Sequence, residues 1–201
     1  ETEVTVNGEP VNVSGAAGKF VCIEREWADG DVVELKMPMS VSSHVWQKNK
    51  AGVSVNYGPL TLSLKIDEVY EEHDSRDHDF VQDDSHWQDG VDASLWPCYV
   101  LKPNSEWNYA LKVDENNLPL NFTVQKKPWP ADDYPFTIES VPYEFTAVGN
   151  QVPSWGYDST GMTDLMPTKY VERSTVDTPL KLVPMGAARL RISVFPREIV
   201  E

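Results

Sequence analysis

The chain has 201 residues, of which 32 are acidic and 17 are basic, and its formal net charge is −15. This excess of carboxylates argues against binding to nucleic acid or to an anionic membrane surface, because both need clustered Lys and Arg. The sequence has no apolar run of about 18 residues, so it contains no candidate membrane-spanning helix. Seven Trp, eight Tyr and six Phe can supply a packed core without a metal or a disulfide.

A β-hairpin is predicted at the start of the chain. Asn7-Gly8 stands between two alternating Val runs, and this dipeptide readily adopts the positive φ angles of a two-residue turn. With that turn, Val4 faces Val11 across the hairpin. A second strand is predicted over residues 19–27, followed by a turn at residues 28–31.

Cys22 and Trp27 both suggest that the strand at residues 19–27 is buried. Cys22 lies inside its apolar pattern and is expected to be a buried free thiol, since Cys22 and Cys98 are too few for a disulfide framework. Trp27 and Trp107 both fall within strand patterns and are expected to fill core. Trp27→Ala would then cost on the order of 3–5 kcal/mol.

Further strands are predicted wherever short runs alternate between apolar and polar residues. The clearest is residues 60–66, in which Leu60, Leu62, Leu64 and Ile66 share one face. With no sustained 3.6-residue period, the pattern favours an all-β fold with two antiparallel β-sandwich or jelly-roll-like units. The other predicted strands are residues 32–37, 41–46, 53–57, 96–101, 107–113, 118–124, 136–141, 144–148, 180–183 and 188–194.

The acidic stretch at residues 67–92 interrupts these patterns and is interpreted as a solvated excursion or a boundary. The expected organisation is a partial first β-sandwich at residues 1–70, an acidic linker or loop at 71–95 and a second β-sandwich at 96–201. In this view the first sheet lacks at least one strand, and its edge is open or covered by other polypeptide.

The acidic stretch also holds the candidate metal ligands Asp74, Asp77 and Asp79, which lie among three histidines. Their spacing fits no zinc pattern and lacks the Gly and Glu of an EF-hand, so calcium is the best of the metal options. A solvated charge run without any metal is the preferred reading.

Catalysis by this chain is not indicated. Glycoside hydrolysis needs two carboxyl groups at a defined separation in a cleft, and the neighbouring acidic residues of a polar loop do not meet that condition. Two tryptophans, Trp129 and Trp87, are candidate carbohydrate contacts, because aromatic rings flanked by polar groups can form ligand sites. Trp129 stands between two prolines in a predicted loop and is the best candidate for an exposed ring. Ordinary packing of that loop is the alternative.

Short segments spread over most of the chain resemble, in order and spacing, the glycoside hydrolase family 127 and its relatives, which includes bacterial β-L-arabinofuranosidases. The segments are residues 5–10 (TVNGEP), 23–27 (IEREW), 29–31 (DGD), 35–39 (LKMPM), 57–60 (YGPL), 105–109 (SEWNY), 182–186 (LVPMG), 190–192 (LRI) and 195–196 (FP). The resemblance implies β-sandwich domains that follow an (α/α) barrel, in which a cysteine nucleophile is held near zinc. Neither Cys22 nor Cys98 stands in a matching motif, so no catalytic residue is carried over and no cofactor is expected in this chain.

The resemblance therefore implies a non-catalytic accessory β-sandwich region of a carbohydrate-active glycoside hydrolase, with the barrel of the same parent protein as its partner. A carbohydrate-binding module that takes plant or microbial glycans is the alternative, and a self-sufficient enzyme is a third hypothesis. The parent is expected to be bacterial and either periplasmic or secreted.

Overall fold

The computed structural model describes residues 2–13, 18–74, 90–114, 121–168 and 170–198. The chain folds as two units, an N-terminal unit (Glu1–Ser40) and a main unit (Val41–Glu201). Among the described residues, the elements with defined bounds are strands and two three-residue 3-10 helices, which confirms the all-β fold. Within the described ranges, no helix has the length and apolarity needed to cross a membrane.

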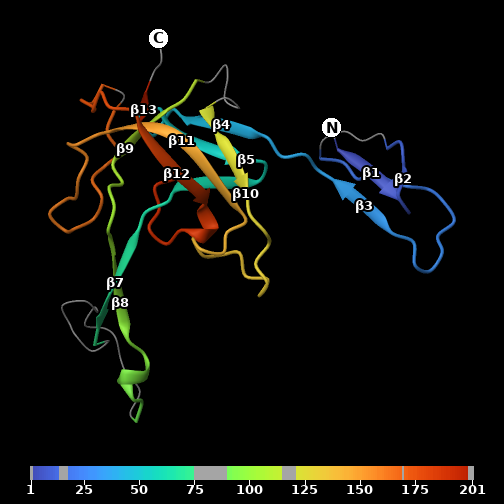
Figure 1. Cartoon of the computed structure of the whole chain (residues 1–201), viewed down its shortest axis with the longest axis horizontal. Coiled ribbons are helices and arrows are strands. Elements are labelled where there is room, and N and C mark those ends of the chain that lie inside the picture. Colours follow the sequence, from blue (N-terminus) through green and yellow to red (C-terminus); the bar gives the residue numbers. More distant parts are fainter. Residues whose placement is uncertain (1, 14–17, 75–89, 115–120, 169, 199–201) are drawn as a thin grey trace. The chain divides into compact units, whose positions relative to one another are not determined.

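The N-terminal unit contains one antiparallel three-stranded sheet with the order β2-β1-β3 (Figure 1). Asn7 (φ 54°) and Gly8 (φ 83°) form the predicted tight turn, and Val11 N donates to Val4 O at 2.9 Å. The predicted hairpin and its register are therefore confirmed. The strands are β1 (Glu3–Val6), β2 (Glu9–Pro10) and β3 (Val33–Lys36).

The predicted strand at residues 19–27 is wrong. The backbone there has no strand pairing, Phe20 is fully exposed and Trp27 is 51% exposed. Cys22 is an exposed free thiol, so its predicted burial is also wrong. The apolar pattern of this segment finds no second layer to pack against within the described part of the N-terminal unit.

The main unit is built on an eight-stranded sheet of order β13-β9-β11-β12-β6-β5-β4, with β10 paired to β11 (Figure 1). All pairs are antiparallel except β13 with β9. The strands are β4 (Val41–Trp46), β5 (Gly52–Tyr57), β6 (Leu60–Leu64), β9 (Tyr109–Lys112), β10 (Thr123–Lys126), β11 (Tyr143–Gln151), β12 (Thr178–Pro184) and β13 (Arg197–Glu198).

The sheet curls into a half-barrel because the chain just before β13 contacts strands near both ends of it. Phe195 and Val53 exchange backbone hydrogen bonds in both directions at 2.9 Å. One residue later, Pro196 O accepts from Leu111 N at 2.9 Å. This crossing segment ties β5 to β9, and the core lies inside the curl.

The core is made of apolar side chains from alternating strand positions. Leu62, Leu64 and Ile66 are buried as predicted, while Leu60 is half-buried. Ser63, on the opposite face of β6, is also buried and donates to Ile192 O at 3.2 Å. The crossing segment therefore covers part of the face that the alternation assigned to solvent.

The structure places the division between units at Ser40 rather than near residue 70. The reason is strand pairing: β6 pairs with β12, with Leu62 opposite Pro184 and Leu64 opposite Leu182. The three strands β4 to β6, expected in a first sandwich, therefore belong to the larger sheet.

The beginning of the acidic stretch forms a strand. β7 (Glu68–His73) pairs with β8 (Cys98–Pro103) in a separate two-stranded ribbon, so the expected linker is replaced here by a hairpin arm (Figure 1). The 3-10 helix η1 (Ala93–Leu95) precedes β8, and η2 (Met185–Ala187) follows β12.

Two predicted strands in the second half are also wrong. Residues 136–141 form turns, because Ser140 N donates to Thr137 Oγ1 and Val141 N donates to Thr137 O. Side chains that bond nearby backbone in this way compete with strand pairing. Residues 188–194 are mostly irregular and contribute single backbone bonds to the sheet instead of a strand.

Candidate functional site

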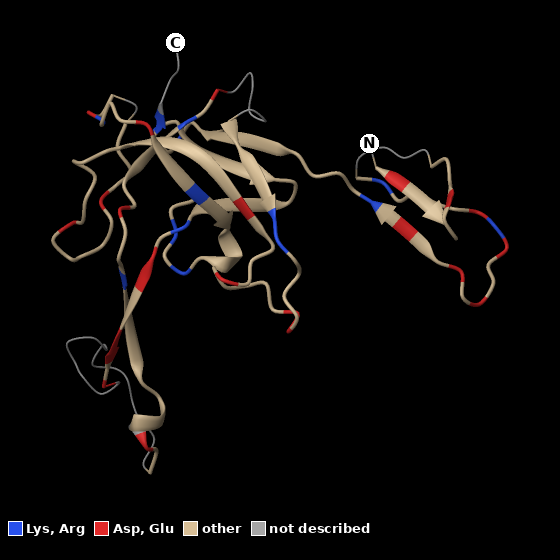
Figure 2. Ribbon diagram, viewed as in Figure 1, with Lys and Arg blue, Asp and Glu red and all other residues tan. Residues whose placement is uncertain are grey.

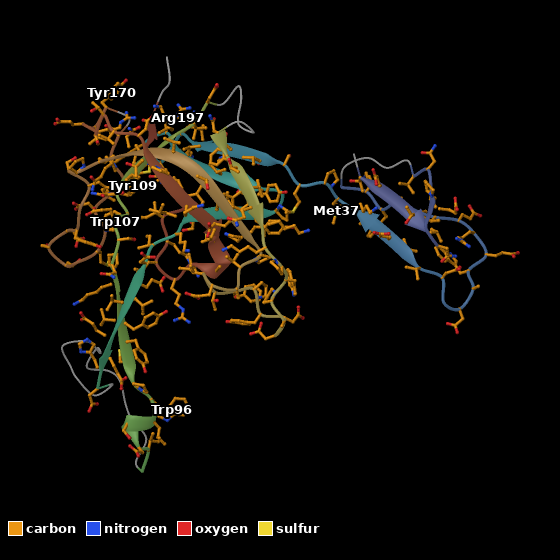
Figure 3. All side chains as sticks on the ribbon, viewed as in Figure 1. Met37, Trp96, Trp107, Tyr109, Tyr170 and Arg197 are labelled. Carbon is orange, nitrogen blue, oxygen red and sulfur yellow. The ribbon has the colours of Figure 1, made fainter. Side chains whose placement is uncertain are left out.

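The tryptophans expected to contact sugar or fill core have different surroundings. Trp129 lies in a loop, is 59% exposed, and its Nε1 donates to Asp133 Oδ1 at 2.6 Å. Trp107 is 8% exposed and packs edge-on against buried Trp155, with ring centroids 5.1 Å apart. The predicted core role of Trp107 is confirmed (Figure 3), whereas that of Trp27 is wrong. Trp87 lies outside the described residues.

Of the candidate metal ligands, the structure describes only Asp74, directly after β7. Asp77 and Asp79 lie outside the described residues. Among the residues that the structure does describe, no three His, Cys, Asp or Glu side chains are grouped so that they could hold a metal ion.

Glu144 is a buried carboxylate on β11, 8% exposed. Its Oε2 lies 3.2 Å from Lys127 Nζ and 3.6 Å from Lys65 Nζ, and its Oε1 lies 3.2 Å from Lys181 Nζ. Figure 2 shows acidic and basic positions on the neighbouring strands β11 and β12.

These ammonium groups decide the protonation state of Glu144. Burial by itself raises the pKa of the carboxyl group, but hydrogen bonds from Lys181 and Lys127 and the charges of Lys127 and Lys65 outweigh it and lower the pKa. A general acid for glycoside hydrolysis needs the opposite shift. Glu144 on β11 is therefore a structural anion that joins β12 to the residues directly after β6 and β10.

A cavity of about 430 Å³ lies beside this cluster and is lined by charged groups of both signs, including Lys65, Lys127, Glu68 and Arg189. Glu68 Oε1 accepts from Leu190 N at 3.0 Å, and Arg189 bonds the hydroxyl of Tyr70 and lies over its ring. Glu68 and Arg189 thus fasten the base of the ribbon to the segment that follows η2.

A second cavity, of about 780 Å³, is mainly apolar. It lies between β8, the loop at residues 157–163 and residues 190–192. Trp107 and Tyr157 form part of its wall, with ring centroids 5.2 Å apart. The described residues of its lining include no acidic side chain, so they offer no carboxyl pair for glycoside hydrolysis.

A third hollow, of about 470 Å³, lies on the outer face of β4 to β6 and combines one tryptophan with uncharged polar groups. Trp46 is 46% exposed there. None of the residues that line it was predicted as a candidate site from the sequence, although alternation along β4 puts Ser42, His44 and Trp46 on one exposed face. The lining residues are His44, Trp46, Ser54, Asn56, Thr61, Met185, Ser193 and Val194.

Comparisons with known proteins agree with the fold. Residues 1–39, which make up nearly all of the N-terminal unit, match the family model described as "Beta-L-arabinofuranosidase, GH127 middle domain". The N-terminal segment of this chain is thus similar to the middle domain of the GH127 β-L-arabinofuranosidases.

Solved structures of glycoside hydrolases share this fold over nearly the whole chain. A glycoside hydrolase matches at 18% identity and a TM-score of 0.50, covering 99% of this chain and 26% of its own. A GH127 β-arabinofuranosidase matches at 18% identity and a TM-score of 0.50, and the match covers 98% of this chain and 23% of that enzyme. A GH127 β-L-arabinofuranosidase from Geobacillus stearothermophilus T6 matches at 20% identity and a TM-score of 0.49, and the match covers 98% of this chain and 25% of that enzyme. The chain therefore spans about a quarter of the length of these structures. The comparison with curated proteins finds no match.

Proposed function

We propose that this chain is a non-catalytic accessory β region of a GH127-like glycoside hydrolase, and that it supports a catalytic domain elsewhere in the same parent polypeptide. On this proposal the parent is a periplasmic or secreted bacterial enzyme that acts on β-L-arabinofuranosides of plant or microbial glycans. The barrel holds the catalytic cysteine and zinc, and this chain supplies neither.

The observation that carries the proposal is the apolar surface of the N-terminal unit, the part that matches the GH127 middle-domain model. On β3, Val33 and Leu35 are 49% and 54% exposed, and Met37, just after the strand, is 67% exposed (Figure 3). Phe20 and Trp27, which lie outside the strands of this unit, are also exposed. A lone three-stranded sheet needs an apolar face packed against another layer for stability, and exposed apolar patches mark interaction surfaces.

Docking of further parent polypeptide onto this surface would stabilise the N-terminal unit, because a partner that binds only the folded state shifts the folding equilibrium. The second layer of the first sandwich and the barrel are the proposed sources of that contact. An accessory role of this kind requires no reactive group in the chain itself.

The test compares the 201-residue chain with the full parent polypeptide. Hydrolysis of 4-nitrophenyl β-L-arabinofuranoside is expected from the parent and not from the chain alone. Amide hydrogen exchange of β3 is expected to be fast in the chain and strongly slowed in the parent. Sugar release by the chain alone, or equal exchange of β3 in both proteins, would contradict the proposal.

A further inference from the structure

The hollow on the outer face of β4 to β6 is set by strand register. His44 lies opposite Ser54, Trp46 opposite Gly52, and Asn56 opposite Thr61. Residues directly opposite each other in an antiparallel pair point to the same face. The register therefore gathers an indole, an imidazole, an amide and two hydroxyl groups on one surface.

Gly52 allows the floor of the hollow to form beside Trp46. A Cβ atom at Gly52 would lie 2.4 Å from Cε of Met166 and 2.9 Å from Cγ1 of Val194. Because the glycine has no side chain, Met166 and Val194 pack directly over the strand, and Val194 becomes part of the lining.

Trp46 is held in one orientation while part of its surface stays open. Its Nε1 donates to Ser54 Oγ at 2.9 Å, and the ring of His44 meets it edge-on with centroids 4.5 Å apart. The indole is nevertheless 46% exposed. A fixed, half-exposed aromatic ring is suited to cover an apolar ligand face at little cost in conformational entropy.

Polar groups in the hollow have unused hydrogen-bonding capacity. Ser193 Oγ has no hydrogen-bond partner among the described residues, but it is buried from water-sized groups, so a ligand reaches it only after neighbouring side chains move. Asn56 Oδ1 accepts from Thr61 Oγ1 at 2.9 Å. The amide nitrogen of Asn56 has no partner in the part of the chain that the structure describes, so it remains available as a donor.

We infer that this hollow binds a neutral sugar ring, with the apolar face of the ring on Trp46 and its hydroxyl groups on Asn56. Among the residues that the structure describes, no Lys, Arg, Asp or Glu lines the hollow, which favours an uncharged ligand over a phosphate or a uronic acid. Its volume of about 470 Å³ falls within the usual range for small-ligand pockets. This activity goes beyond the accessory role and does not depend on it.

The test uses the ¹⁵N-labelled 201-residue chain and three neutral probes: L-arabinose, arabinan oligosaccharides and D-galactose. The acyclic polyol sorbitol serves as a control, because it has hydroxyl groups but no ring face. Binding of at least one sugar is expected to shift the signals of the Trp46 indole and the Asn56 amide side chain, with little shift from sorbitol.

Variants separate this site from the loop tryptophan. Trp46→Ala is expected to weaken binding about tenfold or more, on the scale of a lost aromatic contact, and Trp46→Phe less. Trp129→Ala is the matched control and is expected to leave binding unchanged. Asn56→Ala is expected to weaken binding with the fold intact, as judged by the dispersion of the NMR spectrum.

Three outcomes would overturn the inference. They are no shift with any sugar, equal shifts with sorbitol, and a loss of binding in Trp129→Ala but not in Trp46→Ala. An extended peptide that shifts only the backbone amides of the edge strand β4, where sugars cause no shift, would instead assign the free edge of β4 to strand addition. None of these results would bear on the accessory role, which is tested with the parent polypeptide.

Discussion

The two units of this chain form strands from similar sequence patterns but bury them very differently. In the main unit, alternating residues of β5, β6, β11 and β12 meet inside a curled sheet, and Phe145 and Leu182 are fully buried. In the N-terminal unit, Val4 and Val6 of β1 are buried, but every residue of the neighbouring β3 is exposed. An apolar strand pattern therefore predicts which face of a strand can be buried, but whether that face is buried depends on the polypeptide that packs against it.

The N-terminal unit keeps its shape largely through turns and polar contacts. Asn7 Nδ2 donates to Asp31 Oδ1 at 2.8 Å, and Asn7 Oδ1 accepts from Val32 N at 2.9 Å. Asp31 Oδ2 in turn accepts from Ala28 N at 2.9 Å. One amide side chain thus links the hairpin turn at 7–8 to the turn at 28–31.

The largest expected difference between the units comes from the same substitution made in each. Trp107→Ala removes a buried ring and should cost about 3–5 kcal/mol of unfolding free energy. Trp27→Ala removes a half-exposed ring, over which the Arg25 guanidinium lies 5.1 Å from the centroid. This substitution should cost less than about 1 kcal/mol of unfolding free energy. Urea unfolding of the two variants measures both values.

This pair also sharpens the proposed role of the N-terminal unit. If the surface around Trp27 is covered in the parent polypeptide, Trp27→Ala will become clearly more costly there than in the 201-residue chain. Equal costs for Trp27→Ala and Trp107→Ala in the chain itself would show that the two units do not differ as described.

An intermediate effect is expected from Glu144→Gln, which removes the anion shared by three lysines. The loss should be on the order of 1–2 kcal/mol at neutral pH, the scale of hydrogen bonds to a charged group. Because the pKa of Glu144 is lowered in the folded state, its contribution is present above about pH 4.5, the usual carboxyl value, and is lost as the pH falls toward the lowered pKa.

The measurement is urea unfolding of wild type and Glu144→Gln at several pH values, with exposed Glu172→Gln as the matched control. The difference in unfolding free energy between wild type and Glu144→Gln should become smaller as the pH is lowered. A difference that is independent of pH, or an equal loss in Glu172→Gln, would argue against the lysine cluster as the cause.

The smallest effect is expected at Asn7. Asn7→Ala loses both side-chain hydrogen bonds and places alanine at a φ of 54°, and should destabilise the N-terminal unit by about 1 kcal/mol. Asn7→Gly keeps the turn geometry and loses only the bonds, so it isolates their part. Amide exchange at Val32 reports the result, and unchanged protection in both variants would show that the link between the turns contributes little.

Much of the local structure could be predicted from sequence because it depends on near neighbours. Asn7-Gly8 specified a tight turn and its register, and alternation gave the bounds of β4 as the structure has them. Trp27 and Trp107 lie in similar patterns, yet only the latter is buried, since burial depends on distant strands. The pairing of Val53 with Phe195 leaves no local signal at all.

The candidate site shows the same limit. The exposure of Trp129 followed from its prolines and loop context, whereas the hollow at Trp46 required three strands in a defined register and Ser193 from the crossing segment. Alternation along β4 alone placed Trp46 on the exposed face, but it gave no indication of the polar groups beside it.

The segment around Phe195 and Pro196, which bonds Val53 on one side and Leu111 on the other, has a consequence for biosynthesis. The half-barrel core cannot be completed until the ribosome has made Phe195, although most of its strands emerge much earlier. Until β12 has been made, β6 is an unpaired edge that is exposed to intermolecular pairing of the kind that nascent-chain chaperones suppress. Natural variation that shortens or reroutes this segment should therefore appear first as poor yield from cells, before any change in ligand binding can be measured.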